Sequence, residues 1–293
     1  MNKSISIILI ILLSILSILL IGGLVIGINS NYNFDNFIIT DSYSNKLVEE
    51  KEISNIKDLN IEVDVADAKI EVQDSDSIKI ELYSNNPKTY EINEENNMIK
   101  VVLKNKIRPF NFFNKGAVAK IYVPKNYSNN VIVNSGTGDI KIGDVNNANL
   151  EVKSDVGDVK VNSIFRGVIN SRVGDIKIKK INELNIESKT GDVKVDQVDT
   201  INVKSNTGDI KIGTVNKLLK IKSKTGDVKI ENANIKENSN ISSDIGDVKI
   251  YKAIGCYVNG NTNVGDIKIN NNDRKSNIEL NINSRVGDIK VNY

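Results

Sequence analysis

The sequence contains no histidine, no tryptophan and only one cysteine, Cys256, among its 293 residues. The chain therefore lacks the commonest metal ligand and the commonest general base near neutral pH. A single cysteine cannot form an intramolecular disulfide. Its apolar neighbours favour a small buried hydrophobe over a reactive thiol. These absences argue against an enzyme, and we predict no catalytic residue, no cofactor and no metal site.

Aromatic residues and proline are also scarce, at 5% of the sequence and three residues respectively. The apolar content is mostly Ile, Val and Leu, and enrichment in branched side chains favours strands. The net charge is only +2, from 39 basic and 37 acidic residues. Because this balance gives no electrostatic footprint for a polyanionic duplex, we expect no nucleic-acid partner.

One long uncharged run extends from Ile5 to Ile28. A membrane span needs about 20 apolar residues, whereas a cleaved secretory signal has an apolar region of about 7–15 residues and a small-residue exit site. No convincing exit site follows the run. We predict that residues 1–29 form an uncleaved transmembrane signal-anchor helix, with a cleaved signal as the alternative.

The charges that flank this run predict its orientation. Lys3 precedes it, and Asp35 and Asp41 follow it before basic residues accumulate. The positive-inside tendency then places the N-terminus in the cytoplasm. We expect a single-pass protein of the cell membrane with its repeat domain extracellular. Residues 30–50, rich in Asn, Tyr and Ser, are predicted to be a solvated stalk.

Nine Gly-Asp pairs dominate the remainder of the chain, with successive glycines 17 to 22 residues apart. A serine, or a threonine in one copy, stands three residues before each glycine, and Ile or Val, Lys, and Ile or Val follow each aspartate. The pairs are Gly138 and Asp139, Gly157 and Asp158, Gly174 and Asp175, Gly191 and Asp192, Gly208 and Asp209, Gly226 and Asp227, Gly246 and Asp247, Gly265 and Asp266, and Gly287 and Asp288.

The apolar alternation slips by one residue at each Gly-Asp pair. In one copy, Val152 and Val156 alternate with polar residues, and Val159 and Val161 alternate in the opposite phase. A slip of this kind requires an extra residue at a corner, and glycine can adopt positive φ there without steric cost. One unit has too little apolar surface to fold alone, so the copies are expected to stack.

We therefore predict an all-β fold, a single-stranded β-solenoid of about nine to ten coils over residues 134–293, preceded by one transmembrane α-helix. A β-propeller is the main rival, but its blades need about 40–45 residues. The repeated Asp and Lys residues would form two columns on the outer face. These columns are either a solvated, charge-neutralised surface or a striped surface that binds a polyelectrolyte. A calcium-binding β-roll is disfavoured because its nonapeptide repeats are much shorter.

Residues 51–133 are less regular and are predicted to form a cap and the first coils. Ala66 stands where a degenerate copy of the motif would have glycine. An aromatic loop with Phe110, Phe112 and Phe113 either covers the open end of the stack or contacts a partner or lipid, which makes it the candidate interaction site. The sequence ends directly after the last repeat, so the C-terminal strand edge is predicted to allow self-association.

The order of these segments resembles a known family. An apolar anchor is followed by a strand segment from Leu59 to Ile70, an Ile-Tyr-Val-Pro strand at residues 121–124, and repeated Ser-x-x-Gly-Asp-Ile-Lys-Ile motifs. This order is similar to the bacterial DUF4097 family, whose members are often labelled adhesins. The resemblance covers about residues 50–293. It implies a β-solenoid-like fold at the cell envelope with no established catalytic residues, and some members are associated with envelope-stress systems.

Three functional hypotheses follow. The first is an adhesin-like structural or interaction module that contacts cell-wall polymer or an envelope protein, since repeat proteins present extended binding surfaces. The second is the ectodomain component of a cell-envelope stress-response system. The third, a carbohydrate-active enzyme on a β-helix, is the least favoured because Asp and Lys recur equally in every copy, as structural residues do.

Overall fold

The computed structural model describes residues 45–105, 116–270 and 275–293, which belong to one compact unit, Ser44–Tyr293. The strands are β1 (Leu47–Ile53), β2 (Asp58–Asp64), β3 (Ala66–Gln73), β4 (Ile78–Tyr83), β5 (Pro87–Glu95), β6 (Met98–Asn105), β7 (Ala117–Pro124), β8 (Asn130–Thr137), β9 (Ile140–Val156), β10 (Val159–Val173), β11 (Ile176–Thr190), β12 (Val193–Thr207), β13 (Ile210–Thr225), β14 (Val228–Asn234), β15 (Ser239–Ile245), β16 (Val248–Ile254), β17 (Tyr257–Val264), β18 (Ile267–Ile269), β19 (Glu279–Val286) and β20 (Ile289–Val291).

The described part of the chain contains strands and no helix, and therefore no helix there is long and apolar enough to cross a membrane. The predicted transmembrane helix at residues 1–29 lies outside the described residues, as does most of the predicted stalk at residues 30–50. Strand β1 begins at Leu47, so the last residues assigned to the stalk belong to the sheet instead.

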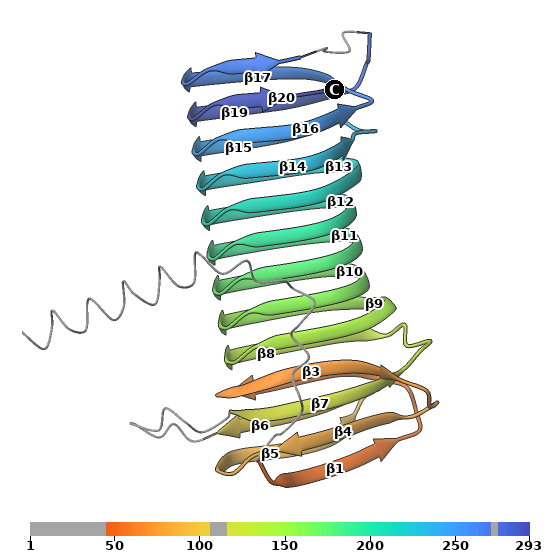
Figure 1. Cartoon of the computed structure of the whole chain (residues 1–293). Coiled ribbons are helices and arrows are strands. Elements are labelled where there is room, and N and C mark those ends of the chain that lie inside the picture. Colours follow the sequence, from red (N-terminus) through yellow and green to blue (C-terminus); the bar gives the residue numbers. More distant parts are fainter. Residues whose placement is uncertain (1–44, 106–115, 271–274) are drawn as a thin grey trace, which may run out of the picture. The chain divides into compact units, whose positions relative to one another are not determined.

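The strands wind into a β-solenoid of about eight turns, and Figure 1 shows how the turns stack. Along β9 to β13, each strand pairs in parallel with the next at matching repeat positions; Val159 aligns with Ile176 and Val173 with Thr190. The β-solenoid prediction is confirmed. The winding has about eight turns rather than the nine to ten coils expected.

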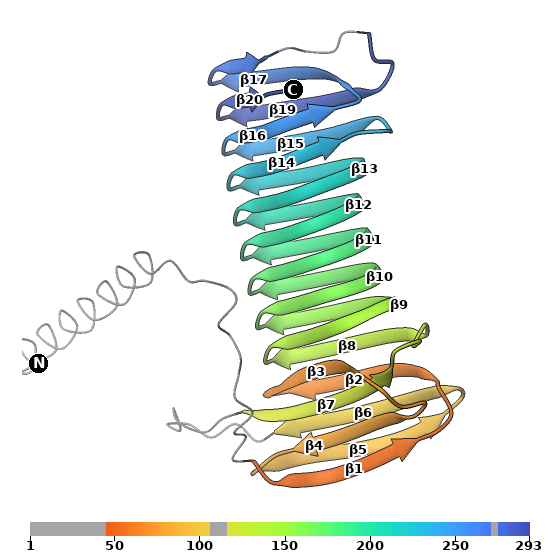
Figure 2. The same cartoon turned by 45° about the vertical axis from the view of Figure 1, so that its right-hand side comes forward.

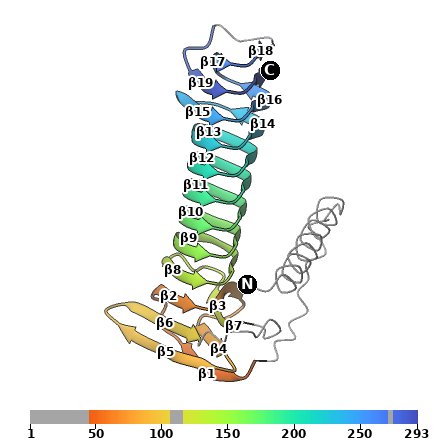
Figure 3. The ribbon, with the colours of Figure 1, turned by 90° about the vertical axis from the view of Figure 1, so that its left-hand side faces the viewer.

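Each turn consists of two facing strand segments joined at the Gly-Asp corner, and Figure 3 shows how narrow the stack is. Alternate side chains point between the segments and form one continuous core. In a single turn, Val159, Val161, Ile164 and Ile169 are all at most 2% exposed. Burial of one such side chain contributes about 1.5–3 kcal/mol. Because one turn buries only a few of these side chains, the stability of the core comes from the stacking of many turns.

At the N-terminal end, β2 and β3 form an irregular turn beneath the first Gly-Asp copy. Ala68 and Ile70 pair with Ile140 and Ile142, which confirms that this segment is a degenerate copy. The positive φ occurs at Val65, with φ of 53°, rather than at Ala66. Below this turn β6 and β7 continue the parallel stack, and the antiparallel strands β1, β4 and β5 complete this end.

At the other end the copies stack out of sequence order. Strand β20 pairs with β16 on one side and with β18 on the other, and β19 lies likewise between β15 and β17. Figure 2 shows this order at the top of the stack. The expectation of an open edge at the C-terminal strand is therefore wrong, because the last repeat inserts between two earlier ones. The outermost strands are β17 and β18.

Candidate interaction surface

The Gly-Asp corner requires glycine for two reasons. The nine corner glycines have φ between 131° and 146°, a conformation that is essentially restricted to glycine. In addition, a Cβ atom on Gly191 would collide with the carbonyl oxygen of Gly174 in the turn below. The same collision with the backbone carbonyl of the neighbouring turn recurs at the other corners, including that of Ala66 beneath Gly138, so successive backbones approach this closely only because the corner residue has no Cβ atom.

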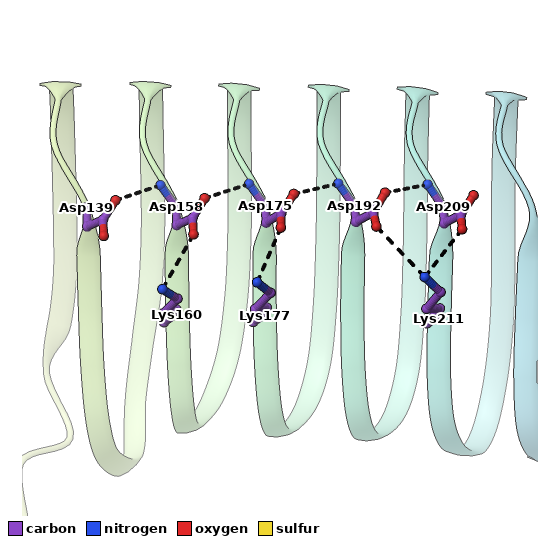
Figure 4. A network of polar contacts seen from close by, with 8 residues as sticks. All are labelled: Asp139, Asp158, Lys160, Asp175, Lys177, Asp192, Asp209 and Lys211. Atoms are coloured by element: carbon purple, nitrogen blue, oxygen red, sulfur yellow. Dashed lines mark hydrogen bonds and ion pairs between the residues drawn. The ribbon is translucent and has the colours of Figure 1, made fainter. Parts of the chain in front are cut away.

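Each corner aspartate except Asp266, at the end of the described stack, accepts a hydrogen bond from the backbone amide of the aspartate in the next turn. In Figure 4 the Oδ1 atom of Asp158 accepts from the amide of Asp175 at 3.0 Å. Such bonds form an unbroken ladder, which we call the aspartate ladder. In order along the stack it consists of Asp67, Asp139, Asp158, Asp175, Asp192, Asp209, Asp227, Asp247, Asp288 and Asp266.

Lysines two residues after the aspartates lie beside the ladder. Five of them form ion pairs with the carboxylate of their own turn at 3.0 to 3.4 Å: Lys160, Lys177, Lys211, Lys229 and Lys290. Lys211 also reaches Asp192 in the turn below, at 3.8 Å. The two predicted columns are thus joined by hydrogen bonds and ion pairs. Most of their charge is matched within the protein.

Three aspartates of the ladder, Asp67, Asp209 and Asp288, have a shifted pKa. Burial raises the pKa of Asp67 at the N-terminal end. Burial would also raise the pKa of Asp209, but the amide of Asp227 and the ammonium of Lys211 together lower it. For Asp288, the amide hydrogen bond from Asp266 and the ion pair with Lys290 lower the pKa. Within the regular stack, these two carboxylates are therefore stabilised as anions.

The serine that stands three residues before eight of the nine corner glycines is buried against the core, whereas Thr262 in the remaining copy is half-buried. Ser188 is 4% exposed, and its Oγ atom has no hydrogen-bond partner among the described residues. Ser135 and Ser243 donate long hydrogen bonds of 3.3 and 3.4 Å to the carbonyl of the corner glycine. The sequence pattern reveals this position by its repetition, but not its burial. The serines are structural, because their side chains face away from solvent.

A groove of about 890 Å³ runs along the outer face of the strand segments that precede the corners. It crosses β2, β6, β8, β9, β10, β11 and β12. Gly136 leaves space beside Asp64, because a Cβ atom there would lie 2.5 Å from the Asp64 carboxylate. Its charged residues are the basic Lys104, Lys153, Arg172, Lys189 and Lys204 and the acidic Glu62, Asp64, Asp155 and Glu187.

The side chains of the groove differ from turn to turn, unlike those of the corners. The position four residues before the glycine holds Lys153, Asn170, Glu187 and Lys204 in successive turns. Several are paired across turns: Arg172 contacts Asp155 at 3.4 Å, and Lys204 contacts Glu187 at 2.8 Å. This face therefore combines a constant backbone with variable polar chemistry. Sequence reasoning missed the groove, since it depends on which side chains the stack brings together.

The remaining candidates lie elsewhere. Phe110, Phe112 and Phe113 lie outside the described residues. Cys256 is fully buried. Within residues 45–105, 116–270 and 275–293, no group of three or more His, Cys, Asp or Glu side chains could hold a metal ion.

Comparisons with known proteins identify a family and several similar solved structures. A family model described as Toastrack DUF4097 matches residues 56–182 and again residues 176–293. No curated protein matches the chain. A "putative adhesin" of known structure from Bacteroides fragilis is 17% identical, with a TM-score of 0.45, and the alignment covers 86% of this chain and 99% of that one.

Two further solved structures are similar in the same way. A "putative cell adhesion protein" from Clostridium sporogenes is 16% identical with a TM-score of 0.28, over 84% of this chain and 99% of that one. A "putative lipid binding protein" from Parabacteroides distasonis is 17% identical with a TM-score of 0.38, over 82% and 96%. At these identities and TM-scores, the three structures carry no argument about the ligand of this chain.

Proposed function

We propose, from the premise that the chain belongs to the DUF4097 (Toastrack) family, that it is a membrane-anchored, extracellular and non-enzymatic interaction module of the cell envelope. The apolar run from Ile5 to Ile28 would anchor it in the membrane. The solenoid would present its grooved face to cell-wall polymer or to an envelope protein. This is an adhesin-like function in the broad sense of surface attachment.

The observation that carries the proposal is the contrast between the corners and the groove. Corner residues are nearly uniform, and their polar atoms bond to one another through the aspartate ladder. The groove carries side chains that change from turn to turn along a rigid parallel stack. Uniform residues maintain the frame, whereas variable outward residues are free to fit a ligand. Extended repeat faces serve this purpose in other solenoids.

A non-enzymatic role agrees with the same contrast. General acid–base chemistry requires carboxylates with distinct environments in one site. Here the corner carboxylates of the Gly-Asp turns repeat one arrangement, in which a carboxylate accepts the backbone amide of the next aspartate. Carboxylates of the groove, such as Asp155 and Glu187, contact basic side chains on the open surface. None of these described carboxylates has the setting of a tuned catalytic acid.

Protease treatment of intact cells that produce the full chain with a C-terminal tag tests the location. The proposal predicts loss of the tag from whole cells, and retention of the tag would contradict it. Crosslinking in the same cells tests the partner. Recovery of wall polymer supports the surface module, whereas stoichiometric recovery of one membrane protein without wall polymer would favour the alternative, a component of an envelope-stress system.

A further inference from the structure

Five lysines gather on the outer face of three successive turns, at the C-terminal end of the groove. We call this cluster the lysine field; its members are Lys189, Lys204, Lys220, Lys222 and Lys224, and all are exposed. Lys220, Lys222 and Lys224 alternate along β13 and so point to the same side of the sheet. Lys204 lies directly beneath Lys222 in the parallel register.

Register fixes the spacing of the field. Neighbouring strands lie about 4.8 Å apart, and alternate residues of one strand about 6.8 Å apart. Lys189, Asn206 and Lys224 occupy equivalent positions in three successive turns, so Lys189 lies two turns below Lys224. Five ammonium groups therefore occupy a patch only two strand spacings high and two alternate residues wide. Because parallel pairing holds these strands in register, the array is preorganised.

The lysine field carries charge that the rest of the face does not neutralise. Within the described residues, Lys204 pairs with Glu187 at 2.8 Å, while Lys189, Lys220, Lys222 and Lys224 have no ion pair. The other carboxylate beside the field is that of Asp244, which lies next to Lys224 at the equivalent position of the following turn. Five lysines minus two carboxylates give a local charge of +3, against +2 for the whole chain.

The corner lysines provide an internal comparison. Lys160, Lys177 and Lys229 lie beside carboxylates of their own turns at 3.2 to 3.4 Å, so an external anion would have to compete with those carboxylates. The sequence pattern predicts polyelectrolyte binding at the corner columns as one of two interpretations. The charges favour the lysine field instead, because its cations are exposed and mostly unpaired.

We infer that the lysine field binds a linear phosphate-bearing polyanion that lies along the grooved face. Lysine is a compact point charge that suits phosphate groups, and neighbouring Asn202 and Asn206 can donate hydrogen bonds. The groove continues the same face beyond Lys189, which leaves room for an extended chain. This inference rests on the proposed function, since it names the ligand class of that surface.

An anionic membrane is the less suitable occupant of this face. Membrane-surface binding combines basic residues with apolar or aromatic side chains that enter the lipid. In the described chain, none of the large exposed apolar side chains lies on residues 184–190, 201–207 or 219–225. The outward positions there hold Lys, Asn, Glu and Thr. A hydrated polymer matches this surface better than a lipid interface does.

The test is the binding of inorganic polyphosphate to the full chain in phosphatidylcholine nanodiscs. Lys220→Gln/Lys222→Gln/Lys224→Gln removes three charges from the field. Lys160→Gln/Lys177→Gln/Lys229→Gln is the matched control, since it removes three paired charges from the corners. Each lysine near an anionic surface contributes about a fivefold factor in affinity. The field variant should therefore bind on the order of 100-fold more weakly, while the control binds as the wild type does.

Salt dependence supplies a second readout. Each phosphate contact adds about 0.7–0.9 to the slope of log affinity against log salt, so the field variant should lose about two units of slope. Lys189→Gln/Lys204→Gln, on the lower turns, should weaken binding independently. Equal polyphosphate affinity in the wild type and the field variant would overturn the inference, as would equal loss in the control.

Binding only to phosphatidylglycerol vesicles, with none to polyphosphate, would also overturn the inference. Thermal melts of each variant establish that the fold is intact, because exposed substitutions of this kind should leave the melting temperature nearly unchanged. Failure of the proposed function is a different result. It would appear as a repeat domain that protease cannot reach on intact cells, and it does not depend on polyphosphate affinity in nanodiscs.

Discussion

The backbone amide of Asp192 donates a hydrogen bond of 3.0 Å to the Oδ1 atom of Asp175, 17 residues earlier and one turn below. The same relationship joins every adjacent pair in the aspartate ladder. At each corner the chain turns away from the regular sheet pairing, and the side chain of one turn binds the amide of the next. The carboxylate therefore substitutes for a backbone carbonyl at the point where the sheet bends.

Replacement of a corner glycine should be costly. We expect Gly191→Ala to lower the free energy of unfolding by about 3 kcal/mol, because positive φ is strained for alanine and its Cβ would collide with Gly174. Gly116→Ala is the matched control, since nothing lies within 4 Å of a Cβ there. Urea denaturation measures both. Similar costs for the two would refute the account of the corner.

The ladder predicts different effects for two substitutions of Asp192. Its Oδ1 atom accepts the amide of Asp209 at 2.9 Å. Asp192→Asn retains an acceptor oxygen and should lower the free energy of unfolding by under about 1 kcal/mol. Asp192→Ala leaves the amide of Asp209 without an acceptor and should lower it by about 1–3 kcal/mol. The comparison is made by urea denaturation at neutral pH. If the two variants were equally unstable, charge rather than the acceptor would be the essential feature.

Acid should destabilise the stack through carboxylates whose pKa is lowered in the folded state. The amide of Asp266 and the ammonium of Lys290 lower the pKa of Asp288, and the pKa of Asp209 is also lowered. A lowered folded-state pKa gives stability that is present above the ordinary value, 3.8, and is lost as pH falls toward the folded-state value. The free energy of unfolding should therefore decline below about pH 4.

The pKa of Asp67 is shifted in the opposite direction, because burial raises it. Urea midpoints measured between neutral and acidic pH should decline less steeply in Asp209→Asn/Asp288→Asn than in the wild type. Asp67→Asn should not reduce the decline. An unchanged profile in the double variant would show that these aspartates are not responsible for the acid sensitivity.

We predict that the chain self-associates through the free edge of β18 in the outermost turn, rather than through the C-terminal strand. Within the described residues, β18 pairs only with β20, and Ile267 is 46% exposed although the equivalent residues inside the stack are buried. An open apolar edge favours pairing with a second copy. Crosslinking of the full chain in nonionic detergent should capture a dimer, and Ile267→Lys should abolish it. A wild-type chain that remains monomeric at high concentration would contradict this prediction.

The sequence was sufficient to predict the corner and the core because both depend on local pattern. The phase slip at Gly157 and Asp158 predicts a turn, and the alternation of Val159 and Val161 predicts which side chains are buried. These features recur in copy after copy, so chance agreement with another fold is improbable. Ala66 could be recognised as a degenerate corner for the same reason.

The order of the last turns could not be predicted in this way. Identical motifs pair equally well with any neighbour, so the pattern does not specify that β20 lies between β16 and β18. The one sequence signal is the longest spacing, 22 residues between Gly265 and Gly287, which gives the chain enough length to return. The aspartate ladder and the lysine field could not be predicted from the sequence either, since both depend on contacts between turns.

Retention of the full chain on isolated cell wall from cells that produce it tests the central claim most directly. The account predicts saturable binding that is competed by polyphosphate, is lost when all five residues of the lysine field are changed to Gln, and is unaffected by Lys160→Gln/Lys177→Gln/Lys229→Gln. Wall binding that is absent in the wild type, or that persists unchanged without the lysine field, would contradict it.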